Sequence, residues 1–354
     1  MRSIISIAVT ITLFACKREA RHSYAIKDFR VELQPQLHRI VAEAIVQPYD
    51  SALHFMATDN ELKRLSNSEH PILRACALKE MLERISFNYI DVLFNHLDDT
   101  ATVVTDEGEF GVDYQAVSDY LLEGSRYKTQ EEKNKVIDRV LTKHNYLRSA
   151  YTILTRIEPQ EKYYTIIKKM AAGNRKFAYD PAKHLYDVTD CALYGLAKFR
   201  KKEDIPLIRE ALLKKPGWLS SLSFALMKEF PDSSYMQVYE AYYPNSYYKA
   251  INFREVDEAV DFIQSIASYK NERSAAILQA ILDKKTINDY STDSYIKERL
   301  LAEIAKYKGG YAKIEKQFAK QLHQYQEDKI TLPLPAPVTI VGDTSERTIR
   351  WWQQ

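Results

Sequence analysis

A polar turn that joins two helices recurs in imperfect copies along this chain, and its spacing constrains the fold more than any other feature. Residues 62–70 predict the end of one helix and a turn, and Pro71 suits the first position of the next helix, where no backbone N–H is needed. Ser68 is the candidate N-cap of that helix. Its apolar side chains then fall at helical spacing, at Leu73, Cys76, Ala77 and Met81.

Two pairs of similar segments indicate an internal repeat. The leucine, arginine and small residues of 70–76 return at 144–150, 74 residues later. Residues 117–122 resemble 188–193, which lie 71 residues further on. Both separations correspond to two units of about 37 residues, which is a length typical of repeats built from helix pairs.

A third pattern extends the repeat through the second half of the chain. Apolar residues stand at offsets 0, 3, 9, 12 and 16 from Leu154, Leu196 and Met227, and more weakly from Ile266. These starting points are 42, 31 and 39 residues apart. The last predicted pair, 295–308 and 311–326, keeps the helical pattern without those offsets, as terminal repeats that cap a stack often do.

The junction at 62–82 resembles the helix junction of HEAT repeats, an armadillo-like α-solenoid family. The resemblance covers residues 35–327 and implies an all-α fold, a right-handed α-α superhelix in which helix pairs stack on one another. In this family an arginine at the position of Arg74 and Arg148 often pairs with an acid of the next unit, and Asp119 and Asp190 are candidates for such structural pairs. HEAT-like proteins are mostly protein-binding scaffolds, so we expect a non-enzymatic protein.

The N-terminus resembles the signal peptide of bacterial lipoproteins. Met1-Arg2 precede a short apolar run that ends Leu13-Phe14-Ala15-Cys16, which is similar to a lipobox. The resemblance implies cleavage after residues 1–15, acylation of Cys16 with chains such as palmitate, and a tether over 16–34. Lys17 after the cysteine is similar to lipoproteins of the outer membrane, and we expect the periplasmic face. An ordinary cleaved signal or a chance cysteine is the alternative.

Two other cysteines, Cys76 and Cys191, occur in Cys-Ala-Leu triplets inside predicted helices. Equivalent positions in different repeats lie far apart along a stack, so we expect two buried thiols and no disulfide.

Two segments break the helical pattern. Residues near 99–112 predict a β-hairpin-like insertion with Gly108 at its turn. Its acidic residues do not follow the pattern of a calcium-binding loop, so no metal site is expected. The segment 328–354 contains alternating prolines that favour an extended C-terminal tail. The tail could cap the last repeat, stay loose or dock a partner.

No catalytic or cofactor motif is recognisable in the chain, so we expect no cofactor. The net charge is only +2, from 50 basic and 48 acidic residues, which gives no general attraction for nucleic acid. The resemblances to HEAT repeats and to bacterial lipoproteins together imply the favoured function, a lipid-anchored scaffold that binds a protein partner in the cell envelope.

Tyrosine is unusually abundant, with 25 residues in the chain. A dense group occurs at Tyr235, Tyr239, Tyr243 and Tyr247. Tyrosine combines a flat apolar ring with a hydroxyl that can hydrogen-bond, so such a group can grip peptides or stack on sugars. The alternative function is a lipoprotein that captures glycans or peptides through a Tyr-rich surface around 235–248, whereas packing between repeats is the structural explanation.

Overall fold

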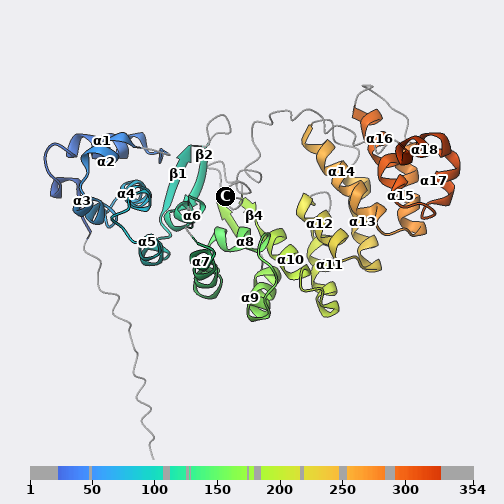
Figure 1. Cartoon of the computed structure of the whole chain (residues 1–354), viewed down its shortest axis with the longest axis horizontal. Coiled ribbons are helices and arrows are strands. Elements are labelled where there is room, and N and C mark those ends of the chain that lie inside the picture. Colours follow the sequence, from blue (N-terminus) through green and yellow to red (C-terminus); the bar gives the residue numbers. More distant parts are fainter. Residues whose placement is uncertain are drawn as a thin grey trace, which may run out of the picture.

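The computed structural model describes residues 23–47, 50–106, 112–124, 127, 129–173, 175–178, 185–215, 219–246, 253–283 and 292–327. The fold described by these residues is mostly helical (Figure 1). Cys16, Tyr247 and the segment 328–354 lie outside them.

The helices form two rows, in each of which consecutive members contact one another. The first row contains α4 (Pro71–Glu83), α6 (Val117–Glu123), α8 (Arg148–Leu154), α10 (Thr189–Ala197), α12 (Ser221–Glu229), α14 (Phe253–Ala267), α16 (Thr292–Ala305) and α18 (Ala319–Glu327). The second row contains α5 (Tyr89–His96), α7 (Gln130–Lys143), α9 (Glu161–Ala172), α11 (Ile205–Leu213), α13 (Met236–Ser246) and α15 (Glu272–Asp283).

The remaining helices complete the two ends. At the N-terminal end α1 (Gln34–Glu43), α2 (Ser51–Met56) and α3 (Asp59–Leu65) all contact α4. At the other end α17 (Ala312–Gln317) contacts α18. Three short 3-10 turns are η1 (Ile26–Asp28), η3 (Lys202–Asp204) and η4 (Ser233–Tyr235).

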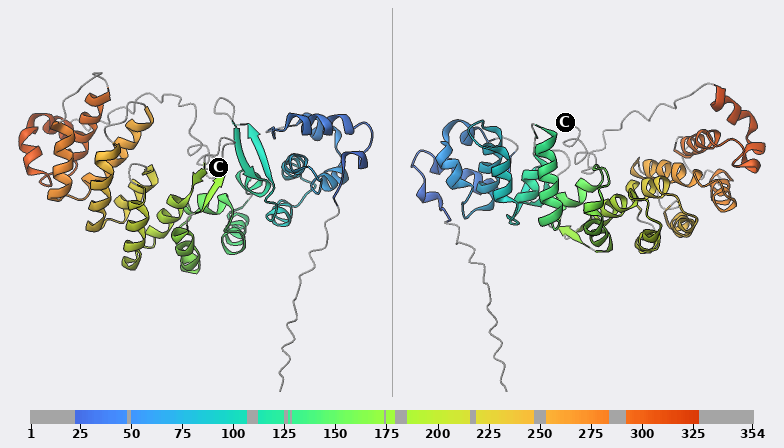
Figure 2. Two further views of the ribbon diagram at one scale, coloured as in Figure 1. Left: turned by 180° about the vertical axis from the view of Figure 1, so that it is seen from behind. Right: turned by 60° about the horizontal axis from the view of Figure 1, so that its bottom comes forward.

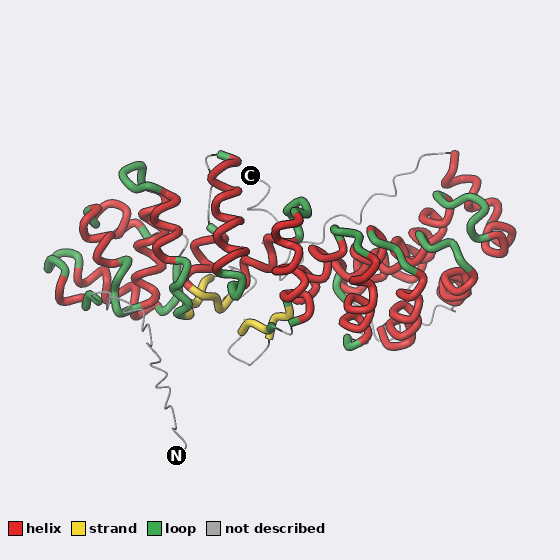
Figure 3. Tube along the Cα trace, turned by 90° about the horizontal axis from the view of Figure 1, so that it is seen from below, coloured by secondary structure: helices red, strands yellow, loops and turns green. Residues whose placement is uncertain are grey.

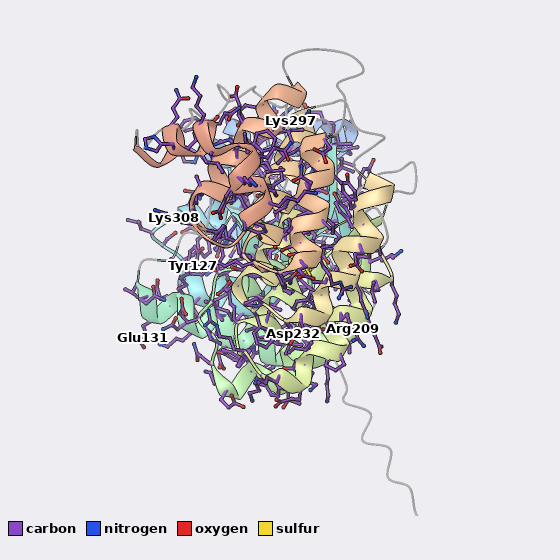
Figure 4. All side chains as sticks on the ribbon, turned by 90° about the vertical axis from the view of Figure 1, so that its right-hand side faces the viewer. Tyr127, Glu131, Arg209, Asp232, Lys297 and Lys308 are labelled. Atoms are coloured by element: carbon purple, nitrogen blue, oxygen red, sulfur yellow. The ribbon has the colours of Figure 1, made fainter. Side chains whose placement is uncertain are left out.

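The rows bend into an arc. In Figure 1 the first row lies on the upper, inner side and the second row on the lower, outer side, and both ends of the molecule rise. The same arc is visible from behind (Figure 2). The view along the long axis shows Arg209 of α11 and Asp232 at the lower side, with Lys297 of α16 at the upper side (Figure 4).

Helix α7 shows why these short segments are helical. The Thr129 side chain caps its start by accepting a hydrogen bond from the Glu132 backbone N–H. Its buried side chains, Val136, Ile137, Val140 and Leu141, follow the helical period and form one apolar stripe. A helix of this length cannot bury such a stripe alone, so its stability depends on the neighbouring helices.

Two antiparallel hairpins interrupt the helical rows. The strands β1 (Thr102–Asp106) and β2 (Val112–Ala116) confirm the insertion predicted near 99–112, although its turn lies outside the described residues. The strands β3 (Lys176–Ala178) and β4 (Leu185–Asp187) were not predicted. Each hairpin leads directly into a first-row helix, α6 or α10, and both are yellow in Figure 3.

The N-terminal part corrects two predicted boundaries. The sequence pattern of residues 49–66 predicts one helix, but the structure has α2 and α3 there, because Thr58 and Glu61 form a capping box that starts α3. Residues 24–33 of the expected tether pack on the domain, since Ile26, Phe29 and Leu33 are buried. The folded region therefore begins before residue 35.

The helix junction predicted at residues 62–82 is present, but its N-cap residue differs from the predicted one. Pro71 lies at the start of α4, as its missing N–H favours. The N-cap is His70 and not Ser68, whose hydroxyl accepts a hydrogen bond from the His70 backbone N–H at 3.3 Å. Cys76 and Cys191 are both buried, as expected.

Candidate functional site

The tyrosine group considered as an alternative binding surface lies mostly in the core. Tyr235 and Tyr239 are completely buried, and Tyr243 is half-buried with its ring stacked on Phe262 at 6.3 Å between centroids. Tyr247 lies outside the described residues. The structure therefore gives the first two rings a packing role, which removes them from any surface that could grip a glycan or peptide.

Hydrogen bonds explain why tyrosine is used at core positions 239 and 269. The Tyr239 hydroxyl lies 2.5 Å from Ser265 Oγ, which itself donates to the Phe224 carbonyl at 2.7 Å. Tyr269 donates to the Met227 carbonyl at 2.9 Å. Burial raises the pKa of Tyr239 well above its usual value, so the ring stays neutral. These bonds join α13, α14 and α12.

Ion pairs occur at the repeat junctions, as the sequence indicated. Arg74 of α4 makes two hydrogen bonds to Asp99, from Nε at 2.6 Å and from Nη2 at 3.0 Å. Asp190 of α10 accepts from Lys215 Nζ at 2.9 Å and from the Ser220 hydroxyl at 2.7 Å. Ser220 is the N-cap of α12, so this contact links consecutive first-row helices.

The densest polar cluster surrounds Arg148 at the start of α8. Its guanidinium donates to Asp113 through Nη1 at 3.1 Å and Nη2 at 2.7 Å. Nη2 also donates to Gln115 Oε1 at 3.1 Å and to Glu123 Oε1 at 2.8 Å. Asp119 of α6 accepts hydrogen bonds from the backbone of residues 148 and 149. Strand β2, α6 and α8 therefore meet at one arginine.

The electrostatics of this cluster are unusual because one cation faces three carboxylates. Burial raises the pKa of Glu123 to about 7, Arg148 opposes this shift, and Asp119 and Asp113 add to it. Burial lowers the pKa of Arg148, but Glu123 and Asp113 raise it well above its usual value. Glu123 therefore changes its charge near neutral pH, whereas the arginine stays charged.

The cluster fixes the β1–β2 hairpin in place. Asp113 and Gln115 are buried, and their partners across the hairpin, Thr105 and Val103, are buried as well. The base of the hairpin is held through Asp99, whose backbone carbonyl accepts from the Ser118 N–H at 3.0 Å and whose side chain binds Arg74. One face of the hairpin is thus locked against the helices.

The other face of the hairpin is partly open. Val104 and Tyr114 are opposite each other in the register and both are half-buried. Val112, the first residue of β2, is exposed. The hairpin stands on the inner side of the arc (Figures 1 and 2). This face carries Val104, Val112 and the Tyr114 phenol beside the exposed Thr102, and such a mixture of apolar and hydroxyl groups suits contact with another protein.

Sequence reasoning found Arg148 and the hairpin but did not connect them. Gln115 and Glu123 were overlooked, and Asp113 was considered only as one of the acids of a possible calcium site, because a repeat pattern shows which residues recur and not which side chains an insertion adds. The alternation of polar and apolar residues along β2 was the available signal, since Asp113 and Gln115 fall on one face.

Two further properties concern the described residues alone. They contain no group of three or more His, Cys, Asp or Glu side chains placed to hold a metal ion. None of their helices combines the length and hydrophobicity of a membrane-spanning helix.

In comparisons with known proteins, no family model, no curated protein and no solved structure matches the chain.

Proposed function

We propose that this chain is a non-enzymatic, lipid-anchored scaffold of the bacterial cell envelope. Its domain is a HEAT-like, right-handed α-solenoid that binds a protein partner on its inner face. Acylated Cys16 is its attachment to the outer membrane, with the domain in the periplasm. The proposal rests on the lipobox-like sequence before Cys16 and on the stacking of helices in two rows.

The observation that carries the binding role is the β1–β2 hairpin. The hairpin face that carries Asp113 is held against the helices by Arg148. On its opposite face, Val104, Tyr114 and Val112 stay partly accessible. An apolar surface held in one geometry loses little conformational entropy when a partner binds. A hairpin inserted in a row of helices also adds a local feature by which one partner can be distinguished from another.

In-cell photo-crosslinking tests the binding role. A photoreactive phenylalanine derivative replaces Tyr114 in one strain and Lys135 in another. Lys135 is an exposed residue of α7 in the second, outer row, and serves as the matched control. We expect a discrete adduct with one envelope protein from position 114 and none from position 135. Equal adducts from both positions, or none from position 114, would contradict a partner on the inner face.

Removing the acylation site tests the anchor. We expect Cys16→Ser to abolish palmitate incorporation and to release the protein from the membrane fraction, because the acyl chains supply the attachment. A Cys76→Ser variant is the control, since Cys76 is buried in the domain. Retention of the Cys16→Ser protein in membranes would contradict lipid anchoring.

A further inference from the structure

Exposed apolar side chains are concentrated at the N-terminal end of the described chain. Four of the five exposed large hydrophobic residues lie there: Val31 is 75% exposed, Phe55 78%, Met56 36% and Ile85 98%. The fifth, Val112, belongs to the β1–β2 hairpin. We refer to Val31, Phe55, Met56 and Ile85 as the N-terminal apolar patch.

Hydrogen bonds gather this patch around the end of α2. Arg84 donates through Nη2 to the carbonyls of Leu53 at 3.1 Å and His54 at 2.9 Å. Arg30 donates through Nη2 to the Met56 carbonyl. At His54 and Met56 the arginines satisfy carbonyls near the helix end, whereas the Leu53 carbonyl also accepts from the Ala57 backbone N–H. Residues 31 and 85 follow these two arginines directly in the chain, so each lies within about the reach of one arginine side chain from the end of α2.

The charges beside the patch suit an interface between apolar and polar surroundings. Arg30 pairs with Glu61 at 2.8 Å, and Arg84 pairs with Glu80 and Asp59, each at 2.9 Å. Glu61 and Glu80 are buried, whereas the Arg30 side chain is half exposed. The Arg30 guanidinium therefore stands at the surface, paired with Glu61, and a group of this kind can stay at the headgroups while apolar side chains enter lipid.

The tether places the patch close to the proposed anchor. Tyr24 is fixed beside the end of α3, since it exchanges backbone hydrogen bonds with Asn67 and Glu69, each at 3.2 Å. The start of α3 lies next to Arg84, which binds Asp59. A helix of seven residues is about 10 Å long. The seven residues from Cys16 to the first described residue can span at most about 25 Å.

We infer that the N-terminal apolar patch docks against the surface of the lipid bilayer. The inference rests on the proposed acylation of Cys16, which would hold the patch within reach of the membrane. Contact with lipid would add a second, weak attachment and restrict the orientation of the domain, as single acyl chains combined with a second signal do. We assign a lipid surface as the binding partner of the patch, because the proposed anchor keeps the domain within reach of the membrane and so raises the effective concentration of one for the other.

Fluorescence of the full, lipidated chain tests this orientation. Ile85→Cys is labelled with an environment-sensitive NBD fluorophore in protein extracted from membranes and reconstituted into phosphatidylethanolamine–phosphatidylglycerol vesicles. Cys76 and Cys191 are buried, and burial raises the pKa of Cys76 to about 12, so neither competes for the label. We expect a blue shift of the emission and quenching by spin-labelled lipid.

Val112→Cys, labelled in the same way, is the matched control, because position 112 is also an exposed hydrophobic residue but lies on the hairpin. We expect no blue shift there. Adding Phe55→Asp to the Ile85→Cys protein should remove the quenching at position 85, because a charge in the patch opposes contact with the acyl region.

The outcomes separate this inference from the proposed anchor. If acylated protein floats with vesicles but its NBD emission at position 85 does not shift, the docking is wrong and the anchor is retained. Equal shifts at 85 and 112, or a shift that depends on protein concentration without vesicles, also overturn the docking. Protein that carries no acyl chain overturns the anchor and the docking together.

Discussion

Arg148 and Asp113 face each other through two hydrogen bonds, of 3.1 and 2.7 Å, although 35 residues separate them in the chain. Both side chains are largely buried. The pair joins strand β2 to the start of helix α8 in a two-pronged geometry that lysine could not reproduce. The hairpin on the inner side of the arc is therefore held by a specific contact and not only by apolar packing.

Removal of the arginine should destabilise the domain strongly. In Arg148→Met the carboxylates of Asp113, Asp119 and Glu123 lose their shared cation while remaining near one another. Loss of one partner from a buried pair typically costs about 3–5 kcal/mol. We expect a large fall in the urea midpoint, measured by circular dichroism.

The control for this variant is an exposed ion pair of the same chemistry. Arg273 and Glu240 pair at 2.5 Å with both side chains about half exposed. Exposed pairs contribute roughly 0.2–1 kcal/mol, so Arg273→Met should shift the midpoint little. Equal losses for the two variants would show that the cluster around Arg148 has no special role.

Glu123 should make stability depend on pH. Its pKa is raised to about 7 by burial, against a usual value of 4.5. The folded state therefore holds a proton that the unfolded chain releases, and this contribution to stability is lost as the pH rises from about 4.5 to about 7. The side chain is 21% exposed, so we expect an effect of roughly 1–3 kcal/mol.

A comparison with Glu123→Gln isolates this effect. Glutamine keeps an oxygen that can accept from Arg148 but does not ionise. We expect the variant to match the natural protein near pH 5 and to be the more stable of the two near pH 8, as measured by urea unfolding at each pH. A stability difference that does not change with pH would refute the raised pKa.

Two tyrosines that are equally buried should respond differently to loss of the hydroxyl. Tyr239 bonds to Ser265, whereas the Tyr235 hydroxyl has no hydrogen-bond partner among the described residues. Tyr239→Phe should cost about 1 kcal/mol in the free energy of unfolding, and Tyr235→Phe should cost nothing or stabilise slightly. Both are measured by urea unfolding; the reverse order would contradict the packing described here.

Close packing between consecutive helices should make Gly195→Ala destabilising. A Cβ atom at residue 195 of α10 would lie 2.9 Å from Leu154 Cβ of α8 and 3.7 Å from Ile167 of α9. Alanine favours a helix by about 1 kcal/mol over glycine, but overpacking typically costs about 1–3 kcal/mol. Leu154 Cβ cannot move without its backbone, so we expect a net loss in thermal stability. A gain would indicate looser packing between units.

The sequence predicted the helical pattern better than the ends of its helices. The sequence pattern of residues 114–123 predicts a helix over that range, but α6 begins at Val117, because residues 112–116 pair with β1 and form strand β2. Residues 311–326 form two helices, since α17 ends at Gln317 before α18 begins at Ala319. Helical periodicity extends across such breaks, whereas strand pairing and caps depend on residues far away or on local backbone geometry.

The candidate site was harder to predict than the fold. Arg74 and Arg148 were identified from their repeated positions, and both are paired in the structure. Tyr235 and Tyr239 were assigned to a possible surface because composition does not show which way a ring points. The β3–β4 hairpin was missed since its strands have only three residues each, which is too short for an alternating pattern to stand out.

Small-angle X-ray scattering tests the central claim that the domain is an open stack, on which the inner binding face depends. A compact globule of this length would have a radius of gyration of about 20 Å. We predict a clearly larger value, a skewed pair-distance distribution, and a region in which intensity falls with the inverse of the scattering angle, as for a rod. A symmetric distribution with a radius near that of the globule would contradict the account.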